Sequence, residues 1–501
     1  MLALPLIFRL SLALTASLSA LAVSYWPYSA QAATLTTIPR ASYAGMQTIT
    51  YRYGPITINP GQNIIRFHPS SLHPQGSGYI TRFQPNMIRL DGSIPRVDQL
   101  HLHHAVWLVN NSPLFAAGEE KTTIQMPQGF GIRTNPGDRW IVNDMLHNLW
   151  PTTERVYLTW TVDWVPLAAA QTANIKEAKI NWMDVAGITA YPVFDVLKGS
   201  GSGGRYTFPD QATGAEARKV GAAATWTVPQ DMTLVGGAGH LHPGGLWLDL
   251  KVRRDNQEKL LFRSLAHYFE PAGAVSWDVA MTATKPSWRV RLKAGDQLSI
   301  HAVYDSHRAS WYESMGIFPL AFSTESGAGG DDPFVTQPDT TGWVTHGHLA
   351  ENDNHGGKSI GLPDFSKLRD GSRVSNVDIR NYIYTRGDMT LSGQVGLPPL
   401  VAPGSSIRFI NWDATSLLSP EKSAYHTLTA CKLPCNKSTG IAYPLADADI
   451  PFDSGELGYG PGYATPTINR NTWSTPKNLT KGTYTYFCRI HPFMRGAFRV
   501  K

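Results

Sequence analysis

Hydrophobic and polar positions alternate, or hydrophobic ones cluster, in short stretches along most of the chain. Residues 48–58, 155–164 and 406–412 are examples in which β-branched and aromatic side chains dominate. Such stretches predict strands, and Gly, Pro, Asn and Asp separate them. Stretches with the 3.6-residue period of an amphipathic helix are nearly absent. Together with 45 glycines and 35 prolines, the pattern predicts an all-β protein built of sandwiches.

The length predicts several domains, because 501 residues exceed what one core organises and a domain holds about 100–200 residues. A glycine/serine stretch at residues 198–204 and a Gly/Asp/Asn/His-rich stretch at 324–362 have the composition of joints. We therefore expect two consecutive domains, a His/Gly-rich linker and a third domain, at residues 33–198, 205–325, 326–375 and 376–501.

The N-terminal segment, residues 1–32, predicts a cleaved secretory signal peptide. Arg9 precedes an apolar run at residues 10–23, and the small-x-small pattern at residues 30–32 is typical of a cleavage site. The run is shorter than the ~20 residues that span a bilayer, and no later stretch is apolar enough to do so. We expect an exported protein, periplasmic or extracellular, without a stable membrane span. A retained N-terminal anchor is the alternative.

Charge gives no sign of a nucleic-acid partner. Without the expected signal peptide, 43 basic residues stand against 38 acidic ones, and neither Lys nor Arg occurs in runs.

The chain has three cysteines. Cys431 and Cys435 are close enough in sequence to form a small disulfide loop, which export permits. Cys488 is then left alone, and a lone cysteine in an exported protein is either a liability or a reactive or metal-binding thiol.

The surroundings of Cys488 favour a metal-binding thiolate. A tight loop between two strand-like stretches carries Cys488, His491 and Met494, and His426 on an earlier strand is placed to join them. Two imidazoles, a thiolate and a weak axial thioether form the ligand set of a type 1 (blue) copper, which is an electron-transfer centre. The alternative is a buried structural cysteine beside a chance histidine and methionine.

Residues 376–501 resemble the cupredoxins, and the Cys-x₂-His-x₂-Met loop is most similar to that of amicyanin. The resemblance implies a Greek-key β-sandwich with one type 1 copper. The 62 positions from His426 to Cys488 are more than a minimal cupredoxin needs.

Six histidines upstream occur in motifs or near them: His101, His103, His104, His147, His240 and His242. In a strand, His-x-His places two imidazoles on one face, so both can reach one ion. Adjacent His103 and His104 point to opposite faces of a regular strand, so joint ligation requires a bulge or a strand end. A hydrogen-bonded structural role is the alternative for each histidine alone. The grouping favours copper, which neutral imidazoles bind well.

The order of these motifs over residues 85–325 resembles the copper type II monooxygenase family of peptidylglycine α-hydroxylating and dopamine β-monooxygenase. The resemblance implies two jelly-roll-like β-sandwiches with a copper in each. The implied ligands are His103, His104 and His147 for the first copper, and His240, His242 and Met315 for the second, catalytic one.

Three departures from that family bear on stability and on the substrate. The family enzymes contain several disulfides, whereas this region has no cysteine. Ala238 stands where the peptide-amidating enzyme has an arginine for the substrate carboxylate, and Ile317 and Pro319 stand where it has Asn and Tyr. We therefore expect a small apolar or aromatic substrate.

Residues 345–357 contain a further group, His346, His348 and His355. It is either a polar solvated loop or an additional metal site near the third domain.

These resemblances imply an exported copper-dependent monooxygenase with up to three coppers per chain. It would hydroxylate a C–H bond of a small organic substrate with O₂, and the blue-copper domain would relay electrons from an external donor or redox partner protein. Two alternatives stay open: a non-enzymatic electron-transfer or copper-carrier protein, and a multidomain copper oxidase or reductase. Against the last, Phe487 and Arg489 flank Cys488, where those enzymes have His-Cys-His.

Overall fold

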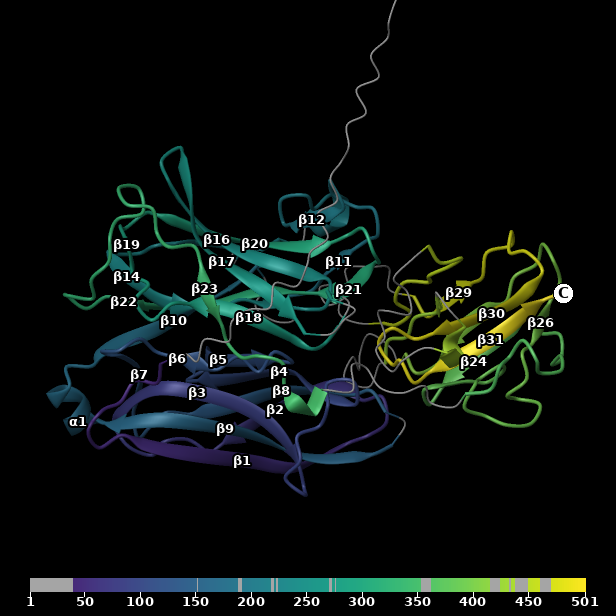
Figure 1. Cartoon of the computed structure of the whole chain (residues 1–501), viewed down its shortest axis with the longest axis horizontal. Coiled ribbons are helices and arrows are strands. Elements are labelled where there is room, and N and C mark those ends of the chain that lie inside the picture. The colour runs from purple at the N-terminus through teal and green to yellow at the C-terminus, as the bar shows by residue number, and fades with distance from the viewer. Residues whose placement is uncertain are drawn as a thin grey trace, which may run out of the picture.

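The chain folds into three β-sandwiches, which confirms the predicted all-β class (Figure 1). The computed structural model describes residues 39–150, 152–187, 192–217, 220–221, 224–269, 273–274, 276–352, 362–414, 424–431, 434–437, 449–459 and 470–501. The expected signal peptide lies outside these ranges. Helix within them is limited to α1 (Leu167–Thr172), α2 (Gly214–Ala217) and short 3₁₀ turns such as η2 (Ala350–Asn352) and η4 (Cys435–Lys437). None of the described helices is long and apolar enough to cross a membrane.

The first sandwich packs a four-stranded sheet against one end of a ten-stranded sheet. The four-stranded sheet has the order β2 (Asn63–Ser70), β8 (Trp140–Asn148), β4 (Leu100–Val109), β5 (Ser112–Gly118). The opposing strands are β1 (Gln47–Ile58), β9 (Glu154–Pro166), β3 (Gly78–Arg89) and β7 (Phe130–Thr134), with β6 (Ile124–Gln125) beside β3. Aromatic side chains fill the space between the sheets, with Phe83 stacked on Phe115 at 4.2 Å and both in contact with a cluster that includes Trp107.

The ten-stranded sheet continues into the second sandwich through β10 (Lys176–Asp184), β22 (Gly316–Ser323), β14 (Met232–Gly237) and β19 (Val290–Leu292), with β15 (His240–Leu241) beside β22. The facing sheet has the order β12 (Arg205–Phe208), β20 (Gln297–Asp305), β16 (Gly245–Arg254), β17 (Gln257–Tyr268), β18 (Val279–Thr284), β23 (Gly342–Val344), with β13 (Thr225–Thr227) on β20. A two-stranded sheet joins β11 (Phe194–Val196) to β21 (Trp311–Ser314).

Two of the expected domain limits differ from this arrangement. Strands β10 and β11 precede the expected boundary at residue 198, yet they hydrogen-bond to β22 and β21 of the second sandwich. Residues 342–344 belong to the expected linker, yet as β23 they extend the second sandwich beside β18. Strand pairing over long sequence distances decides both cases, and glycine-rich composition does not reveal it.

The third sandwich consists of two four-stranded sheets. Their orders are β25 (Ile383–Tyr384), β24 (Asn376–Arg380), β27 (Arg408–Asn411), β29 (Thr472–Ser474), and β26 (Leu400–Val401), β31 (Arg495–Val500), β30 (Gly482–Phe487), β28 (Thr429–Ala430). It lies at one end of the two core sandwiches (Figure 1). The predicted disulfide joins Cys431 to Cys435.

Candidate metal centres

The loop between β30 and β31 brings Cys488, His491 and Met494 together. The Met494 amide donates to the His491 carbonyl at 2.9 Å, and the Cys488 amide donates to the Met494 carbonyl at 3.0 Å. These two bonds close a tight loop at the end of the strand pair. Met494 is 1% exposed and packs in the same buried cluster as Cys488.

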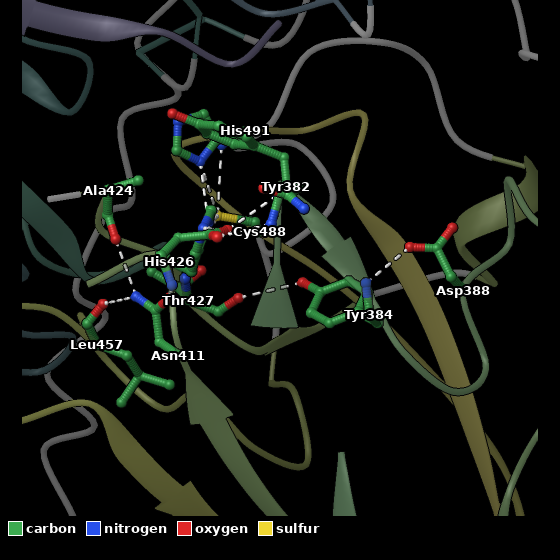
Figure 2. Close-up of polar contacts among 12 residues, drawn as sticks. Tyr382, Tyr384, Asp388, Asn411, Ala424, His426, Thr427, Leu457, Cys488 and His491 are labelled. Atoms are coloured by element: carbon green, nitrogen blue, oxygen red, sulfur yellow. Dashed lines mark hydrogen bonds and ion pairs between the residues drawn. The ribbon is translucent and has the colours of Figure 1, made fainter. Parts of the chain in front are cut away.

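His426 faces this loop from the segment before β28, and three donor atoms converge (Figure 2). Cys488 Sγ lies 3.8 Å from His426 Nδ1 and 3.7 Å from His491 Nδ1, and the two Nδ1 atoms are 3.1 Å apart. All three side chains are buried. Two imidazoles and one thiol at these distances, with a thioether nearby, fit the donor set of a type 1 copper.

The environment of Cys488 favours the thiolate, which is the form that binds metal. Burial alone would raise the pKa of the thiol, but the hydrogen bonds and charges of His426 and His491 lower it well below its usual value. The backbone amides of Thr427 and His491 also donate to Cys488 Sγ, at 3.3 and 3.4 Å.

Asp413 and Asn411, two residues that the sequence reasoning missed, hold His426 and its surroundings in place; Figure 2 shows Asn411 with its two acceptors. Asp413 Oδ2 accepts a hydrogen bond from His426 Nε2 at 3.0 Å, which directs Nδ1 toward Cys488. Burial would raise the pKa of Asp413, but the hydrogen bond from His426 keeps it low. Asn411 Nδ2 donates to the carbonyls of Ala424 and Leu457, at 2.9 and 2.7 Å. Asn411 lies at the end of the predicted strand 406–412, and Asp413 directly follows that strand.

A second cluster, on β4 and β8, contains His101, His103 and His147, whose candidate donor atoms lie within 4.8 Å of one another. The register of β4 against β8 shifts between Leu102 and His104, which is the bulge that joint use of adjacent histidines requires. Of the predicted triad, His103 and His147 converge with His101, while His104 converges with His103 and His242.

The ring nitrogens of this cluster point to a metal. His101 Nδ1 donates to the Val97 carbonyl at 2.9 Å, and His103 Nδ1 donates to Asn63 Oδ1 at 3.0 Å. Both Nε2 atoms are buried and lack a hydrogen-bond partner among the described residues, and neither nitrogen of His147 makes a well-formed hydrogen bond. Buried imidazole nitrogens left unpaired are costly, whereas one nitrogen oriented by an acceptor and the other free is the arrangement of a metal ligand.

His104 instead joins His240 and His242 of the second sandwich. His104 Nε2 and His242 Nε2 face each other at 3.0 Å, and the ring centroids of His240 lie 5.2 Å from those of His104 and of His242. His240 Nδ1 bonds to Glu120 Oε2 at 3.0 Å, while its Nε2 is buried without a described partner. A Cβ at Gly118 would lie 2.6 Å from both the His240 ring and Glu120 Oε2, so this position has no room for a residue larger than glycine.

Protonation differs between the histidines. Burial and then the neighbouring imidazoles lower the pKa values of His103, His104 and His242 well below the usual range, which leaves these rings neutral and able to bind metal. Burial also opposes protonation of His240, but Glu120 outweighs it and raises the pKa. Beside this pair, burial raises the pKa of Glu119 to about 8. The sequence reasoning missed both glutamates, because nothing in residues 118–120 marks them as facing a histidine 120 positions later.

A cavity of about 430 Å³ opens beside His104, His240 and Met315. Its lining is mainly aliphatic and aromatic, and its charged residues are Glu120 and Lys285. Ala238, Ile317 and Pro319, the three departures from the family pattern, all line it. Met315 is 3% exposed and directly precedes β22, in which Ile317 pairs with His240. The site thus offers an apolar chamber bounded on one side by imidazoles and a thioether.

In the predicted group at residues 346–355, the two described histidines make hydrogen bonds with protein atoms. His346 bonds to the backbone carbonyls of Glu120 and Gly347, and His348 Nδ1 bonds to Asp278 Oδ2 at 2.7 Å. His355 lies outside the described residues. A further metal site here stays a prediction.

The third sandwich contacts the core at its candidate copper loop. The rings of His147 and His491 meet edge to face, with centroids 5.7 Å apart. The Tyr382 ring lies 4.9 Å from that of His491. The same ring packs against Gly61 of the first sandwich, so closely that a Cβ at Gly61 would come within 2.4 Å of it. The loop therefore sits directly on the His101, His103 and His147 cluster.

Comparison with known proteins gives limited further information. No protein-family model and no curated protein matches the chain. Among solved structures, the reduced Cu(I) form of an amicyanin variant is 19% identical, with a TM-score of 0.15, over 28% of this chain and 91% of that one. A second amicyanin variant in the Cu(I) form is 22% identical, with a TM-score of 0.14, over 28% and 94%. The copper-containing nitrite reductase of Thermus scotoductus is 12% identical, with a TM-score of 0.17, over 55% of this chain and 58% of that one.

TM-scores this low carry no argument, so the class is defined by the fold and the site themselves. A two-sheet sandwich, a buried thiolate-favouring cysteine and two converging imidazoles define a cupredoxin-like, copper-binding redox protein. Within that class, the two core sandwiches and their histidine clusters set this chain apart from a protein with the blue-copper module alone.

Proposed function

We propose that this chain is an exported copper-dependent monooxygenase that hydroxylates a C–H bond of a small apolar or aromatic molecule and receives electrons through its own blue-copper domain. The observation that carries the proposal is the apolar cavity beside His104, His240 and Met315. A chamber with this lining excludes water and favours the binding of an apolar molecule. The C–H bonds of such a molecule are the ones that hydroxylation would attack. Bound copper would supply one-electron transfer at the blue site and O₂ activation in the core.

The residues around the cavity have separable roles. Glu120 fixes the orientation of His240, so that Nε2 is directed away from the carboxylate and is available as a ligand. Met315 offers a soft thioether, which favours Cu(I). Ala238 and Ile317 place apolar side chains in the lining, so these two positions offer no group that would bind a substrate carboxylate.

The reaction balances with an outside donor. One atom of O₂ enters the substrate C–H bond, and the other leaves as water with two protons. The two electrons come one at a time from an external reductant or redox partner protein, and the contact between His491 and His147 is a direct entry to the core.

The test is oxygen incorporation from ¹⁸O₂ by the copper-loaded full chain, with a panel of small aromatic and aliphatic molecules and their carboxylated analogues. We expect labelled alcohol from the apolar members. In Met315→Ala the product should be lost while the visible Cu–thiolate absorption stays, and Met46→Ala, outside the cavity, should behave as the parent. O₂ consumption without labelled product from any panel member would contradict the proposal.

A multidomain copper oxidase or reductase is the second candidate. It is favoured by the closeness of the cluster of six core imidazoles to the blue-copper loop, since His491 contacts His147 directly. This contact could serve as the connection that flanking histidines would provide, which Cys488 lacks. In that case electrons from the donor would reduce O₂, or another small oxidant, with no organic product.

A further inference from the structure

The six core imidazoles form one continuous cluster across the two sandwiches. Neighbouring ring centroids lie 5.1 Å apart for His101 and His147, 5.6 Å for His101 and His103, and 4.9 Å for His103 and His242. The series of ring contacts is therefore continuous from the histidines on β4 and β8 to the histidines at β15.

The bulge in β4 produces this continuity. His103 and His104 are consecutive residues, and their rings stack at 4.3 Å with an interplanar angle of 24°. His103 nevertheless shares donor distances within 4.8 Å both with His101 and His147 and with His104 and His242. His103 therefore belongs to one group and reaches two histidines of the other.

The space between the triads is too small for a substrate. The cavity lined by His103, His147 and His242 measures about 20 Å³, which is room for one water molecule. The large apolar cavity opens instead beside His104 and His240. A substrate in it would lie beside one triad and not between the two.

From this geometry we infer that the core binds its two coppers as one closely spaced, magnetically coupled dinuclear centre. Its imidazole ligands are His101, His103 and His147 for one ion, and His104, His240 and His242 for the other. The inference rests on the proposed copper occupancy of the core, and it assigns His101 as a ligand. It places both ions on the same side of the substrate, with at most a solvent molecule between them.

The test compares copper content with the paramagnetic copper counted by electron paramagnetic resonance (EPR), in the fully oxidised full chain loaded with Cu(II). We expect three coppers per chain but a spin count near one, from the blue site, or a broadened core signal with a half-field transition. In His101→Ala, which breaks one triad, an isolated type 2 signal from the surviving triad should appear. His267→Ala, a histidine outside the cluster, should leave the spectrum unchanged.

Three coppers with a full, uncoupled spin count would overturn this inference and leave the proposed monooxygenase activity intact. Uptake of a single core copper would also overturn it. A core that takes up no copper would overturn both proposals.

Discussion

His147 and His491 form a contact between the core sandwiches and the third sandwich: their rings stand nearly perpendicular, at 87°, with centroids 5.7 Å apart. Both side chains are 2% exposed. His147 lies on β8 of the first sandwich, and His491 lies in the loop after Cys488. A candidate ligand of the core thus touches a candidate ligand of the blue site, and protein excludes bulk water from the contact.

Replacing His147 should separate the blue site from the core. In His147→Phe, we expect the visible Cu–thiolate absorption to stay, because the change leaves Cys488, His426 and His491 in place. Re-oxidation of the reduced blue site by O₂ should slow by roughly tenfold or more, equivalent to about 1.4 kcal/mol of barrier, in stopped-flow absorption. His307→Ala, an exposed histidine, is the control. An unchanged rate would show that electrons leave the blue site elsewhere.

Removing the Asn411 side chain should loosen the blue site. Asn411→Ala removes the side-chain donor from the carbonyls of Ala424 and Leu457, although the Leu457 carbonyl still accepts from the His426 amide. One group left unpaired inside a protein costs about 1–3 kcal/mol, so the free energy of unfolding of the third sandwich should fall by about that amount in urea titration. The visible absorption should be lost at lower urea. Asn376→Ala, at an exposed position of β24, should change neither, and equal midpoints for the two variants would refute the role of Asn411.

The blue-site residues were predictable because three of the four lie in one short loop. A loop between two strands fixes the relative positions of Cys488, His491 and Met494 almost by itself. His426 needed one further assumption, that its strand lies beside the loop. Asp413 escaped notice because its partner is 13 positions away across a turn, and no periodicity reports such a contact.

The core ligands were only partly predictable, because one bulge rearranges them. The His-x-His spacing of His101 and His103 already placed both on one face of a strand, and their donor atoms converge, together with those of His147. The family resemblance favoured His103 with His104, whose donor atoms also converge, together with those of His242. A register shift between Leu102 and His104 depends on pairing with β8, which the sequence of β4 alone does not specify.

The charge of Asp413 should lower the reduction potential of the blue site. An anion hydrogen-bonded to His426 favours Cu(II) over Cu(I), so Asp413→Asn should raise the potential by some tens of millivolts, where about 59 mV corresponds to a tenfold change in a one-electron equilibrium. Spectroelectrochemistry of the visible absorption measures this shift. Asp378→Asn, a half-buried carboxylate on β24 that pairs with Arg380, should leave the potential unchanged. A fall in potential in Asp413→Asn would contradict the electrostatic argument.

Arg489 should hold the blue-copper loop against the core. Its side chain is buried, donates to the Ser310 carbonyl of the second sandwich, and pairs with Asp453 at 2.8 Å. Its guanidinium also lies 5.4 Å from the centre of the Tyr312 ring. Arg489→Met leaves Asp453 without this cation; loss of one partner from a fully buried pair costs about 3–5 kcal/mol, and the cost is smaller here because Asp453 is part-buried. We therefore expect the sandwiches to separate in part, with a larger radius of gyration in small-angle scattering and slower re-oxidation of the blue site.

A graded series tests whether this effect comes from docking. Arg489→Lys keeps the charge beside Asp453 but loses the planar fork that reaches several acceptors, so it should fall between the parent and Arg489→Met in both measurements. Arg386→Met, an exposed arginine of the third sandwich, should match the parent. If Arg489→Met keeps the parent radius of gyration and yet slows re-oxidation, the arginine tunes the electron path itself and docking does not depend on it. If neither measurement changes, the contact of His147 with His491 and of Tyr382 with Gly61 suffices to hold the loop in place.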